Sequence, residues 1–465
     1  MTGHNVLSRA GIRLAEASEH WFPDAFAFSV IGVGVVFAAA VLGMHQSVAD
    51  VAASFGRGFW DQKLVVFAMQ MVLIIVSGYT IATSPVVYRL IEALAALPRS
   101  GRGAVGFVAL FSMLSSFLSW SFSLIVSGLL ARQIAARDDI KADYRALGAA
   151  AYLSLGSIWA LGLSSSAALL MSKPPDNLLK ISGAIPLTGT IGLPQSITMA
   201  LVLLVASFVI AVMSAPPEGD AKDARALGVR IAPLVFGDDE PPTRPGEWLE
   251  HSPLLTLLLC GIGFTYLGGL VATSGPKALL ALDTYILLQL LVGLLLHWRP
   301  RSFVKAIGRA MPACGGVIIQ YPLYAGIMAM MMDSGLAHHL AVLFVRISTR
   351  DTFPVIVAAY SALLGVFIPS GGAKWLVEAP YLLEAARTLQ VNLGWVVQIY
   401  NAAEALPNLI HPFWMLPLLG VLGLKARDLV GYSALQFVVH VPLVFMLVWL
   451  LHYTVTWVAP VGVTP

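Results

Sequence analysis

The sequence predicts an all-α polytopic membrane protein with about nine full spans plus two opposed re-entrant hairpins in inverted repeats. Hydrophobic residues make up 58% of the 465 residues and charged residues only 11%, and the mean hydropathy is +0.81. Soluble domains do not have this composition. Apolar windows of about 20 residues, the length that crosses a hydrocarbon core about 30 Å thick, recur along the chain. The formal net charge of +3 is small, so no nucleic acid is expected as a partner.

Four parts follow one another along the chain. Residues 1–23 mix acidic and basic residues and lack the separate apolar core of a signal peptide, so we predict an uncleaved amphipathic N-terminal helix. Residues 24–213 form a first membrane half, 214–250 a long polar cytoplasmic linker and 251–465 a second membrane half. We expect full spans near residues 24–43, 63–82, 146–171, 193–213, 253–272, 277–297, 310–332, 394–424 and 428–452.

Basic residues predict the orientation, because Lys and Arg are retained on the cytoplasmic side. With a cytoplasmic N-terminus, 19 of the 28 Lys and Arg residues lie in cytoplasmic segments. The apolar segment 104–131 has basic residues at both ends, so both ends are expected in the cytoplasm. The segment is too short to cross twice, and a re-entrant hairpin satisfies both conditions. Residues 353–386 then form a matching hairpin that enters from the opposite side.

Opposed hairpins suggest inverted repeats that meet at the bilayer midplane. Shifting the sequence by 250 positions pairs Gln70 with Gln320 and Ser84 with Ser334 without a gap. The span near 253–272 has no partner in the first half, so the predicted symmetry is incomplete.

The second hairpin contains Pro369, Ser370, Gly371 and Gly372 in the middle of an apolar segment. Non-helical backbone at membrane depth is tolerated only where protein or a water-filled cavity surrounds it, so we interpret these residues as a hairpin tip. Glycines let backbone N–H groups face a ligand, and helix N-termini carry partial positive charge, which favours an anion such as a carboxylate. We predict that Ser370, Gly371 and Gly372 bind substrate. The alternative is a tight connection between two short spans.

Each hairpin is followed by a span that the sequence predicts to be broken, at residues 156–175 and at 401–417. Pro407 and Pro412 remove backbone donors in the second of these segments. A hairpin tip that faces an unwound helix is a substrate site in several secondary transporters, although small hydroxylated residues also serve helix packing in membranes. The candidate substrate-binding residues of the first half are Ser119, Trp120, Ser121, Ser164 and Ser165.

Ionisable residues in apolar segments are costly and tend to be functional. Glu404 precedes Asn408 by four residues and His411 by seven, so at helical spacing the three would share one face. A carboxylate beside a histidine could carry a coupling proton, and a carboxylate with an amide oxygen and free carbonyls could hold a sodium ion. We predict these three as coupling-ion residues, with Asn408 and His411 also binding substrate. Lys374 and Glu378 are expected to pair with each other near the surface.

The motifs of several other function classes do not occur in the sequence. There are no paired aspartates, no His-Glu-x-x-His and no nucleophile elbow in any span, so an enzyme is not expected. No phosphate-binding G-x-x-x-x-G-K-[ST] loop occurs either, which disfavours ATP-driven transport. Cys260 and Cys314 lie in apolar runs and predict no disulfide or metal site, and no cofactor is expected. A cation/proton antiporter, or a transporter of another small organic anion, remains the alternative.

Several ordered motifs resemble the bacterial short-chain fatty acid transporter family. They include FWDQKLVVFAMQM, QYPLYAGIMAMMMDSGL, IPSGGAKWLVEAPYLLEAA and HPFWMLPLLGVLGLKARDLVGY, and the similarity runs from about Trp21 to about Leu451. The resemblance implies ion-coupled uptake of acetate, butyrate or acetoacetate across the bacterial inner membrane. It also implies inverted repeats, a homodimer and an elevator-like motion.

The resemblance extends to single residues, and it has departures. It is firmest at Pro369 to Gly372, Trp375, Glu404, Asn408 and Pro412 to Trp414. Ala373 and Lys374 stand where a third glycine and a histidine are expected, and His411 stands where glutamine is more usual. Residues 161–165 read LGLSS in place of a glycine-rich run. The preferred acid is therefore expected to differ from that of the best-known member.

Overall fold

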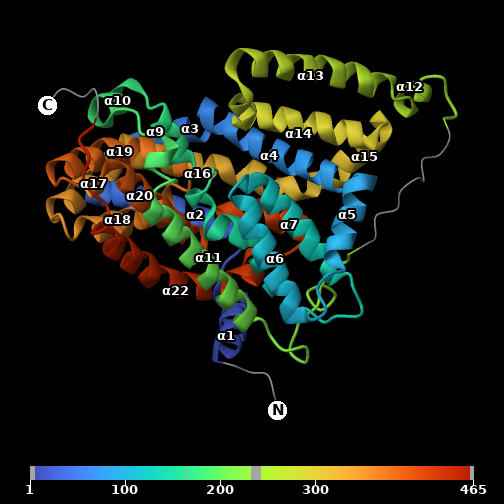
Figure 1. Cartoon of the computed structure of the whole chain (residues 1–465), viewed down its shortest axis with the longest axis horizontal. Helices are drawn as coiled ribbons and strands as arrows, with labels where there is room; N and C mark the ends of the chain where they lie inside the picture. Colours follow the sequence, from blue (N-terminus) through green and yellow to red (C-terminus); the bar gives the residue numbers. More distant parts are fainter. Residues whose placement is uncertain (1–5, 164, 232–241, 461–465) are drawn as a thin grey trace.

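The computed structural model describes residues 6–163, 165–231 and 242–460, and every regular element in these ranges is helical, which confirms the all-α fold (Figure 1). The α-helices are α1 (Val6–Trp21), α2 (Ala25–Ala38), α3 (Val48–Phe59), α4 (Gln62–Ala82), α5 (Pro85–Ala95), α6 (Gly101–Ser116), α7 (Trp120–Ala135), α8 (Tyr144–Gly156), α9 (Ser166–Ser172), α10 (Asp176–Ser182), α11 (Pro194–Ser214), α12 (Glu247–His251), α13 (Leu254–Ser274), α14 (Leu282–His297), α15 (Pro300–Ala310), α16 (Gly315–Asp333), α17 (Leu336–Arg346), α18 (Phe353–Phe367), α19 (Gly371–Thr388), α20 (Leu393–Asn408), α21 (Leu416–Leu422) and α22 (Ala426–His452). Short turns of other helix types lie at Ala39–Gly43, Trp159–Leu161, Leu187–Gly189, Pro276–Leu280, Met311–Cys314 and Phe413–Met415.

The length and composition of the helices bear on the predicted number of full spans, which stays a prediction. Among the described residues, seven helices are long and apolar enough to cross a membrane, and the bent pair of α20 and α21 raises the number to eight at most. The sixth predicted span, near 277–297, corresponds to α14, which has 16 residues. A helix of this length spans about 24 Å, less than the hydrocarbon core of about 30 Å. In Figure 1, α14 runs beneath α13 at one edge of the molecule.

Both predicted hairpins are helical hairpins, formed by α6 with α7 and by α18 with α19. The ends of the first hairpin meet, because the Arg137 guanidinium donates to the carbonyls of Ala95 at 2.6 Å and Pro98 at 2.8 Å. Its two arms are joined by the Ser123 hydroxyl, which donates to the Ser112 carbonyl at 2.6 Å. This hairpin therefore begins and ends at one end of the molecule, as a re-entrant segment must.

The two predicted helix breaks are confirmed. The first broken segment consists of α8, the turn Trp159–Leu161 and α9, and the second consists of α20, the turn Phe413–Met415 and α21, with a bend of 76°. Gly162 lies where the first break crosses the tip of the first hairpin, and a Cβ there would come within 2.7 Å of the Phe117 Cα. Only glycine fits such a close approach of two backbones.

The helix order supports the predicted internal repeat. Six consecutive helices of the first half, α3 to α8, correspond in order to α15 to α20. The first residues of each pair lie 249 to 253 positions apart: Val48 and Pro300, Gln62 and Gly315, Pro85 and Leu336, Gly101 and Phe353, Trp120 and Gly371, and Tyr144 and Leu393. The inverted orientation of the two halves stays a prediction.

The N-terminal helix docks onto protein through small residues. Its buried positions are Ser8, Gly11 and Ala15, and it packs against α22 and α11. A Cβ added to Gly431 of α22 would overlap the Ala15 backbone, so the two helices approach closely. The predicted amphipathic helix is present, and its small-residue face covers α22.

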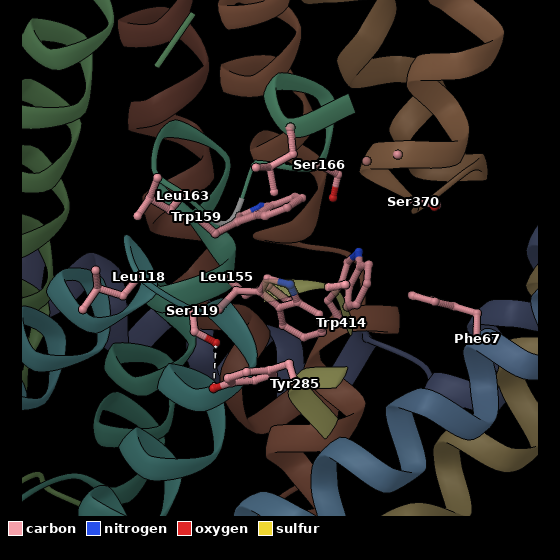
Figure 2. Close-up of a pocket in the computed structure, with 15 residues that line it drawn as sticks. Phe67, Leu118, Ser119, Leu155, Trp159, Leu163, Ser166, Tyr285, Ser370 and Trp414 are labelled. Carbon is pink, nitrogen blue, oxygen red and sulfur yellow. Dashed lines mark hydrogen bonds between the residues drawn. The ribbon is translucent and has the colours of Figure 1, made fainter. Parts of the chain in front are cut away.

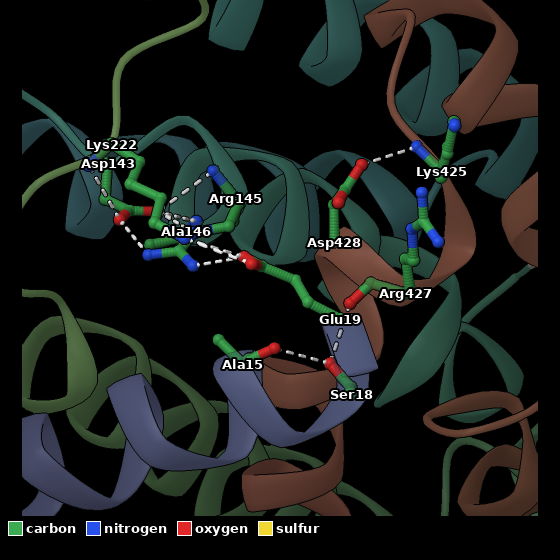
Figure 3. Close-up of polar contacts among 10 residues, drawn as sticks. All are labelled: Ala15, Ser18, Glu19, Asp143, Arg145, Ala146, Lys222, Lys425, Arg427 and Asp428. Atoms are coloured by element: carbon green, nitrogen blue, oxygen red, sulfur yellow. Dashed lines mark hydrogen bonds and ion pairs between the residues drawn. The ribbon is translucent and has the colours of Figure 1, made fainter. Parts of the chain in front are cut away.

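Polar contacts join the N-terminal helix to α8 and to the linker (Figure 3). The Arg145 guanidinium contacts Asp143 at 2.7 Å and Glu19 at 2.5 Å, and the Lys222 ammonium contacts Glu19 at 3.0 Å. Burial works to raise the pKa of the Glu19 carboxyl, but Lys222 and Arg145 outweigh it and hold that pKa below its usual range. The Ser18 hydroxyl also donates to the Arg427 carbonyl.

These contacts gather segments that the sequence assigns to one side of the membrane. Residues 19, 145, 222 and 427 all belong to parts predicted to be cytoplasmic. Segments predicted to lie outside also contact one another, through Arg57 with Asp333 at 3.0 Å and Asn392 with Thr456 at 2.9 Å. The alternation of sides along the chain is therefore consistent with the fold, and the assignment of one side to the cytoplasm stays a prediction.

We predict that Asp143→Ala strongly destabilises the protein. Asp143 pairs with Arg145, whose side chain is 1% exposed, and it also caps α8 and accepts from the Lys222 N–H. Breaking a buried ion pair typically costs about 3–5 kcal/mol, whereas an exposed pair contributes about 0–1 kcal/mol. Thermal unfolding in detergent should show a large loss for Asp143→Ala and almost none for Asp139→Ala, whose ion pair with Arg137 is exposed. Equal small losses would contradict a stabilising role for the buried ion pair of Asp143 with Arg145.

Labelling of single cysteines tests the re-entrant hairpin. Arg99 and Asp138 are exposed and flank α6 and α7, and Lys180 on α10 is exposed in a segment predicted to lie outside. In a chain without the buried Cys260 and Cys314, cysteines at Arg99 and Asp138 should react with an impermeant reagent from the same side, and one at Lys180 from the opposite side. Reaction of the first two from opposite sides would show that α6 and α7 together cross the membrane.

Candidate functional site

The tips of the two hairpins meet at one cavity of about 380 Å³ (Figure 2). Leu118, Ser119 and Trp120 of the first tip and Ser370, Gly371 and Gly372 of the second tip line it. The remaining lining residues are Phe67, Leu155, Trp159, Leu163, Ser166, Leu169, Ala281, Tyr285 and Trp414. The structure thus brings five of the predicted substrate-binding residues together, and their role in binding stays a prediction.

Two helices begin at this cavity, α7 at Trp120 and α19 at Gly371. The first N–H groups of a helix have no acceptor within it and carry partial positive charge. Together the two helix starts make the cavity favourable for an anion.

The glycines at the second tip differ in how closely their neighbours approach. A Cβ on Gly371 would lie 2.8 Å from the Trp159 ring, and one on Gly372 would lie 3.5 Å from the Ser166 Cβ. Gly371 therefore sits where no larger residue fits without displacing Trp159, while Gly372 leaves ordinary contact distance.

Aromatic side chains form much of the wall. Trp120 and Trp414 pack edge to face with ring centroids 5.4 Å apart. The indole nitrogens of Trp159 and Trp414 are buried and have no hydrogen-bond partner among the described residues. A buried N–H without an acceptor is costly, so these two groups are suited to a ligand oxygen. Sequence reasoning missed Trp159; the signal was a tryptophan within a predicted helix break.

The serines predicted in the first half have different surroundings. The Ser119 hydroxyl donates to the Tyr285 hydroxyl at 3.1 Å, which joins the first tip to α14 (Figure 2). Ser165 is buried, and its hydroxyl accepts from the Ala168 N–H and caps α9; the neighbouring Ser166 lines the cavity instead. The predicted Ser164 lies outside the described residues, as does the side chain of Ser121.

Asn408 joins the two broken segments. The Tyr152 hydroxyl donates to the Asn408 carbonyl at 2.9 Å, and the Asn408 amide donates to the Leu155 carbonyl at 3.4 Å. The structure thus places Asn408 between the breaks, where it bonds a side-chain hydroxyl and a backbone carbonyl of α8.

The prediction that His411 shares a helical face with Glu404 and Asn408 is wrong. The helix α20 ends at Asn408, so helical spacing does not extend to His411. The His411 ring packs against Phe28 and Tyr324, each with centroids 5.1 Å away.

Lys374 and Glu378 pair with each other as predicted, but their predicted place near the surface is wrong, because both side chains are fully buried. The Lys374 ammonium lies 2.5 Å from a Glu404 oxygen and 3.5 Å from a Glu378 oxygen. The Ser361 hydroxyl donates to the other Glu378 oxygen at 2.5 Å. The hairpin places α19 inside the protein, so its polar residues meet those of α20. We call Lys374, Glu378 and Glu404 the charge cluster.

The charge cluster lies directly behind the second tip. The Tyr400 ring faces the Lys374 ammonium at 4.6 Å, and the Tyr400 hydroxyl donates to the Gly371 carbonyl at 2.6 Å. A Cβ on Gly371 would lie 3.8 Å from the Glu404 Cγ. Among the described residues, no group of three or more His, Cys, Asp or Glu side chains could hold a metal ion. The predicted sodium site near Glu404 stays untested.

Two solved transporters resemble the chain at low identity. The YdaH transporter of Alcanivorax borkumensis is 16% identical, with a TM-score of 0.44 and 88% of each chain covered. MtrF of Neisseria gonorrhoeae is 14% identical, with a TM-score of 0.41, and the match covers 97% of this chain and 100% of MtrF.

The family model for "Short chain fatty acid transporter" matches residues 6–451. Two proteins named "Putative short-chain fatty acid transporter" are similar over nearly their whole lengths. The protein of Escherichia coli strain K12 is 33% identical over 89% of this chain and 92% of its own. The protein of Haemophilus influenzae is 28% identical over 94% of this chain and 98% of its own. This chain belongs to the short-chain fatty acid transporter family, a family of transporters and not of enzymes.

Proposed function

We propose that the protein is a secondary active transporter of short-chain fatty acids and related small monocarboxylates such as acetate, butyrate and acetoacetate. The observation that carries the proposal is the cavity at which α7 and α19 both begin. Anions are stabilised at helix N-termini, and family membership narrows the anion to a small carboxylate.

In this proposal the carboxylate head group binds between the two tips. Gly371 and Gly372 supply backbone donors, while Ser119 and Ser370 add hydroxyl groups at the same cavity. The short apolar tail lies against the Trp159, Trp414 and Phe67 side chains, which fits the general make-up of ligand sites.

We propose that transport is coupled to a proton or a sodium ion at Glu404 and proceeds by alternating access with an elevator-like motion. We also propose that the protein forms a homodimer in the bacterial inner membrane and that its N-terminus lies in the cytoplasm. Hairpins and broken helices that meet at one cavity support alternating access, and Glu404 lies behind the tip that would hold the substrate. A cation/proton antiporter, or a transporter of another small organic anion, is the alternative. Exchange of radiolabelled butyrate across the membrane of proteoliposomes distinguishes the proposed function from these alternatives.

Gly371→Val should abolish butyrate exchange, because a side chain at this position would collide with Trp159 and fill the space between the tips. The measurement is exchange of radiolabelled butyrate at equal concentrations on both sides, with folding checked by size-exclusion chromatography. Gly268→Val is the matched control, since Gly268 lies in the helix α13 with no neighbour within 4 Å of an added Cβ. Exchange at the wild-type rate in folded Gly371→Val protein would remove the tips from the substrate site.

Glu404→Gln should lose gradient-driven accumulation of butyrate while it keeps exchange at equal concentrations. The substitution preserves shape and removes the charge that faces Lys374. The measurement is initial uptake under an imposed gradient, corrected for protein-free liposomes because the neutral acid permeates lipid. Glu384→Gln on the same helix as Lys374 is the control, since Glu384 is exposed. Accumulation at the wild-type level in Glu404→Gln would place the coupling ion elsewhere.

A further inference from the structure

The Lys374 ammonium has the surroundings of a bound monovalent cation. Glu404 and Glu378 face it at 2.5 and 3.5 Å, and it donates to the Ser361 carbonyl at 2.6 Å. The Tyr400 ring lies 4.6 Å from it, which is the geometry of a cation–π contact. Two carboxylates, a backbone carbonyl and an aromatic face thus enclose one positive charge, and the side chain is fully buried.

Space for this arrangement comes from a glycine on the facing helix. A Cβ added to Gly365 of α18 would lie 3.3 Å from the Glu404 Oε2 and 3.5 Å from the Lys374 Nζ. The Lys374 ammonium therefore fills the position beside the Glu404 Oε2. A second cation at that oxygen would be repelled by the ammonium.

The charges of the cluster do not balance. One ammonium and two carboxylates give a net charge of −1 in a fully buried position, which is expensive inside a membrane. One proton on a carboxylate oxygen brings the cluster to neutrality. The Oε1 atoms of Glu404 and Glu378 are buried and have no hydrogen-bond partner among the described residues. Either oxygen can therefore accept this proton.

We propose that Lys374 takes the place of a coupling cation beside Glu404, so that the charge cluster exchanges a single proton and transport needs no sodium. The inference rests on the proposed transport of a small carboxylate and names the coupling ion of that same site. A proton binds to a carboxylate oxygen of Glu404 or Glu378 on one side of the membrane and leaves from it on the other. The two carboxyl groups titrate as a pair.

The cluster is positioned to sense the substrate. Lys374 lies in the first turn of α19, and its N–H donates to the Ser370 carbonyl at 2.9 Å. Ser370, Gly371 and Gly372 line the cavity on the other side of that turn. A carboxylate at the tip and a net negative cluster behind it repel each other, and protonation of the cluster removes the repulsion. Substrate anion and proton then bind together, which is symport.

Other titratable groups near the cluster are neutral tyrosines or face elsewhere. Tyr360 of α18 and Tyr400 of α20 interact with its carboxylates. The buried His440 of α22, which packs on α18 and α20, contacts Ser207 of α11. His411, in the break after α20, packs against Phe28 and Tyr324. On the other elements that pack against α19, charged residues are exposed: Lys173 after α9, Asp176 and Lys180 on α10, and His338, His339 and Arg346 on α17.

The test measures binding and exchange of butyrate by the purified full chain with and without sodium. Butyrate binding is followed by tryptophan fluorescence, because Trp159 and Trp414 line the cavity, and exchange is followed in proteoliposomes. In choline medium we expect wild-type exchange at full rate, with less than about a twofold change when sodium is added. We expect affinity to rise as the pH falls, by up to about tenfold per pH unit for one linked proton.

Lys374→Met vacates the cation position and should create sodium dependence. We expect added sodium to strengthen butyrate binding at least about fivefold in this variant, within the usual range of coupling between two ligands. The double variant Lys374→Met with Glu404→Gln removes one charge of each sign and keeps the folded state accessible if the single variant does not fold. It should bind butyrate without any sodium response. Lys180→Met, an exposed lysine on α10, should behave as wild type.

The outcomes separate the two proposals. If wild-type protein neither binds nor exchanges butyrate, the proposed function fails and this inference falls with it. If wild-type exchange occurs but needs sodium, or if wild-type affinity ignores pH, the inference alone is overturned. A separate measurement decides whether the ammonium holds the cation position. It uses Lys374→Met, or the double variant if the single variant does not fold. A folded single variant without a sodium response, or a double variant that binds more tightly in sodium, overturns that assignment.

Discussion

Backbone groups freed by a broken helix cannot face lipid, and this constraint organises the centre of the protein. An unsatisfied N–H or carbonyl in hydrocarbon costs several kcal/mol. The structure meets the constraint by gathering the two hairpin tips and two helix breaks in one place, where they satisfy one another. The Leu163 N–H donates to the Phe117 carbonyl at 2.8 Å, so the first break bonds the first tip. Tyr152 and Asn408 join the two breaks, and Tyr400 bonds the second tip at the Gly371 carbonyl.

The same constraint explains why the cavity exists. Irregular backbone exposes donors and leaves room for ligands, and it is stable only when protein surrounds it. A site for a small polar solute inside a membrane therefore needs the elements that a membrane helix otherwise avoids. Ser370 and Gly371 serve the fold and the site at once, because Ser370 lies between α18 and α19, Gly371 begins α19, and both line the cavity.

Much of this architecture follows from local sequence patterns. Long apolar windows predict the helices, and the proline pair Pro407 and Pro412 predicts the second break, because proline removes donors wherever it lies. Basic residues at both ends of 104–131 predict a hairpin whose ends meet, and the Arg137 contacts with Ala95 and Pro98 agree with it. The tips could be paired from sequence as well, since Ser370 and Trp120 lie 250 positions apart and the corresponding helices begin at Gly371 and Trp120.

Side-chain partners across the fold could not be predicted, because they depend on how helices rotate and pack. Lys374 and Glu378 have the spacing of an exposed i, i+4 pair, and nothing local shows that α19 is enclosed or that Glu404 approaches from α20. Trp159 and Tyr285 come from segments far from either tip and reach the cavity only through packing. His411 shows the opposite error, because helical spacing was extended past Asn408, where the helix ends.

The first turn of α19 combines two requirements that would conflict on an ordinary helix. The start of the helix must leave its backbone N–H groups accessible to an anion, and glycine allows this. The interior face of the helix must bury charged side chains, and these need oppositely charged partners close by. Lys374 follows Ser370 by four positions, so one turn of helix carries both faces, and the backbone hydrogen bond between the two residues is part of that turn. In the two proposals above, the same turn would hold a carboxylate at the tip and a proton at the cluster. Any movement of that turn moves both sites together.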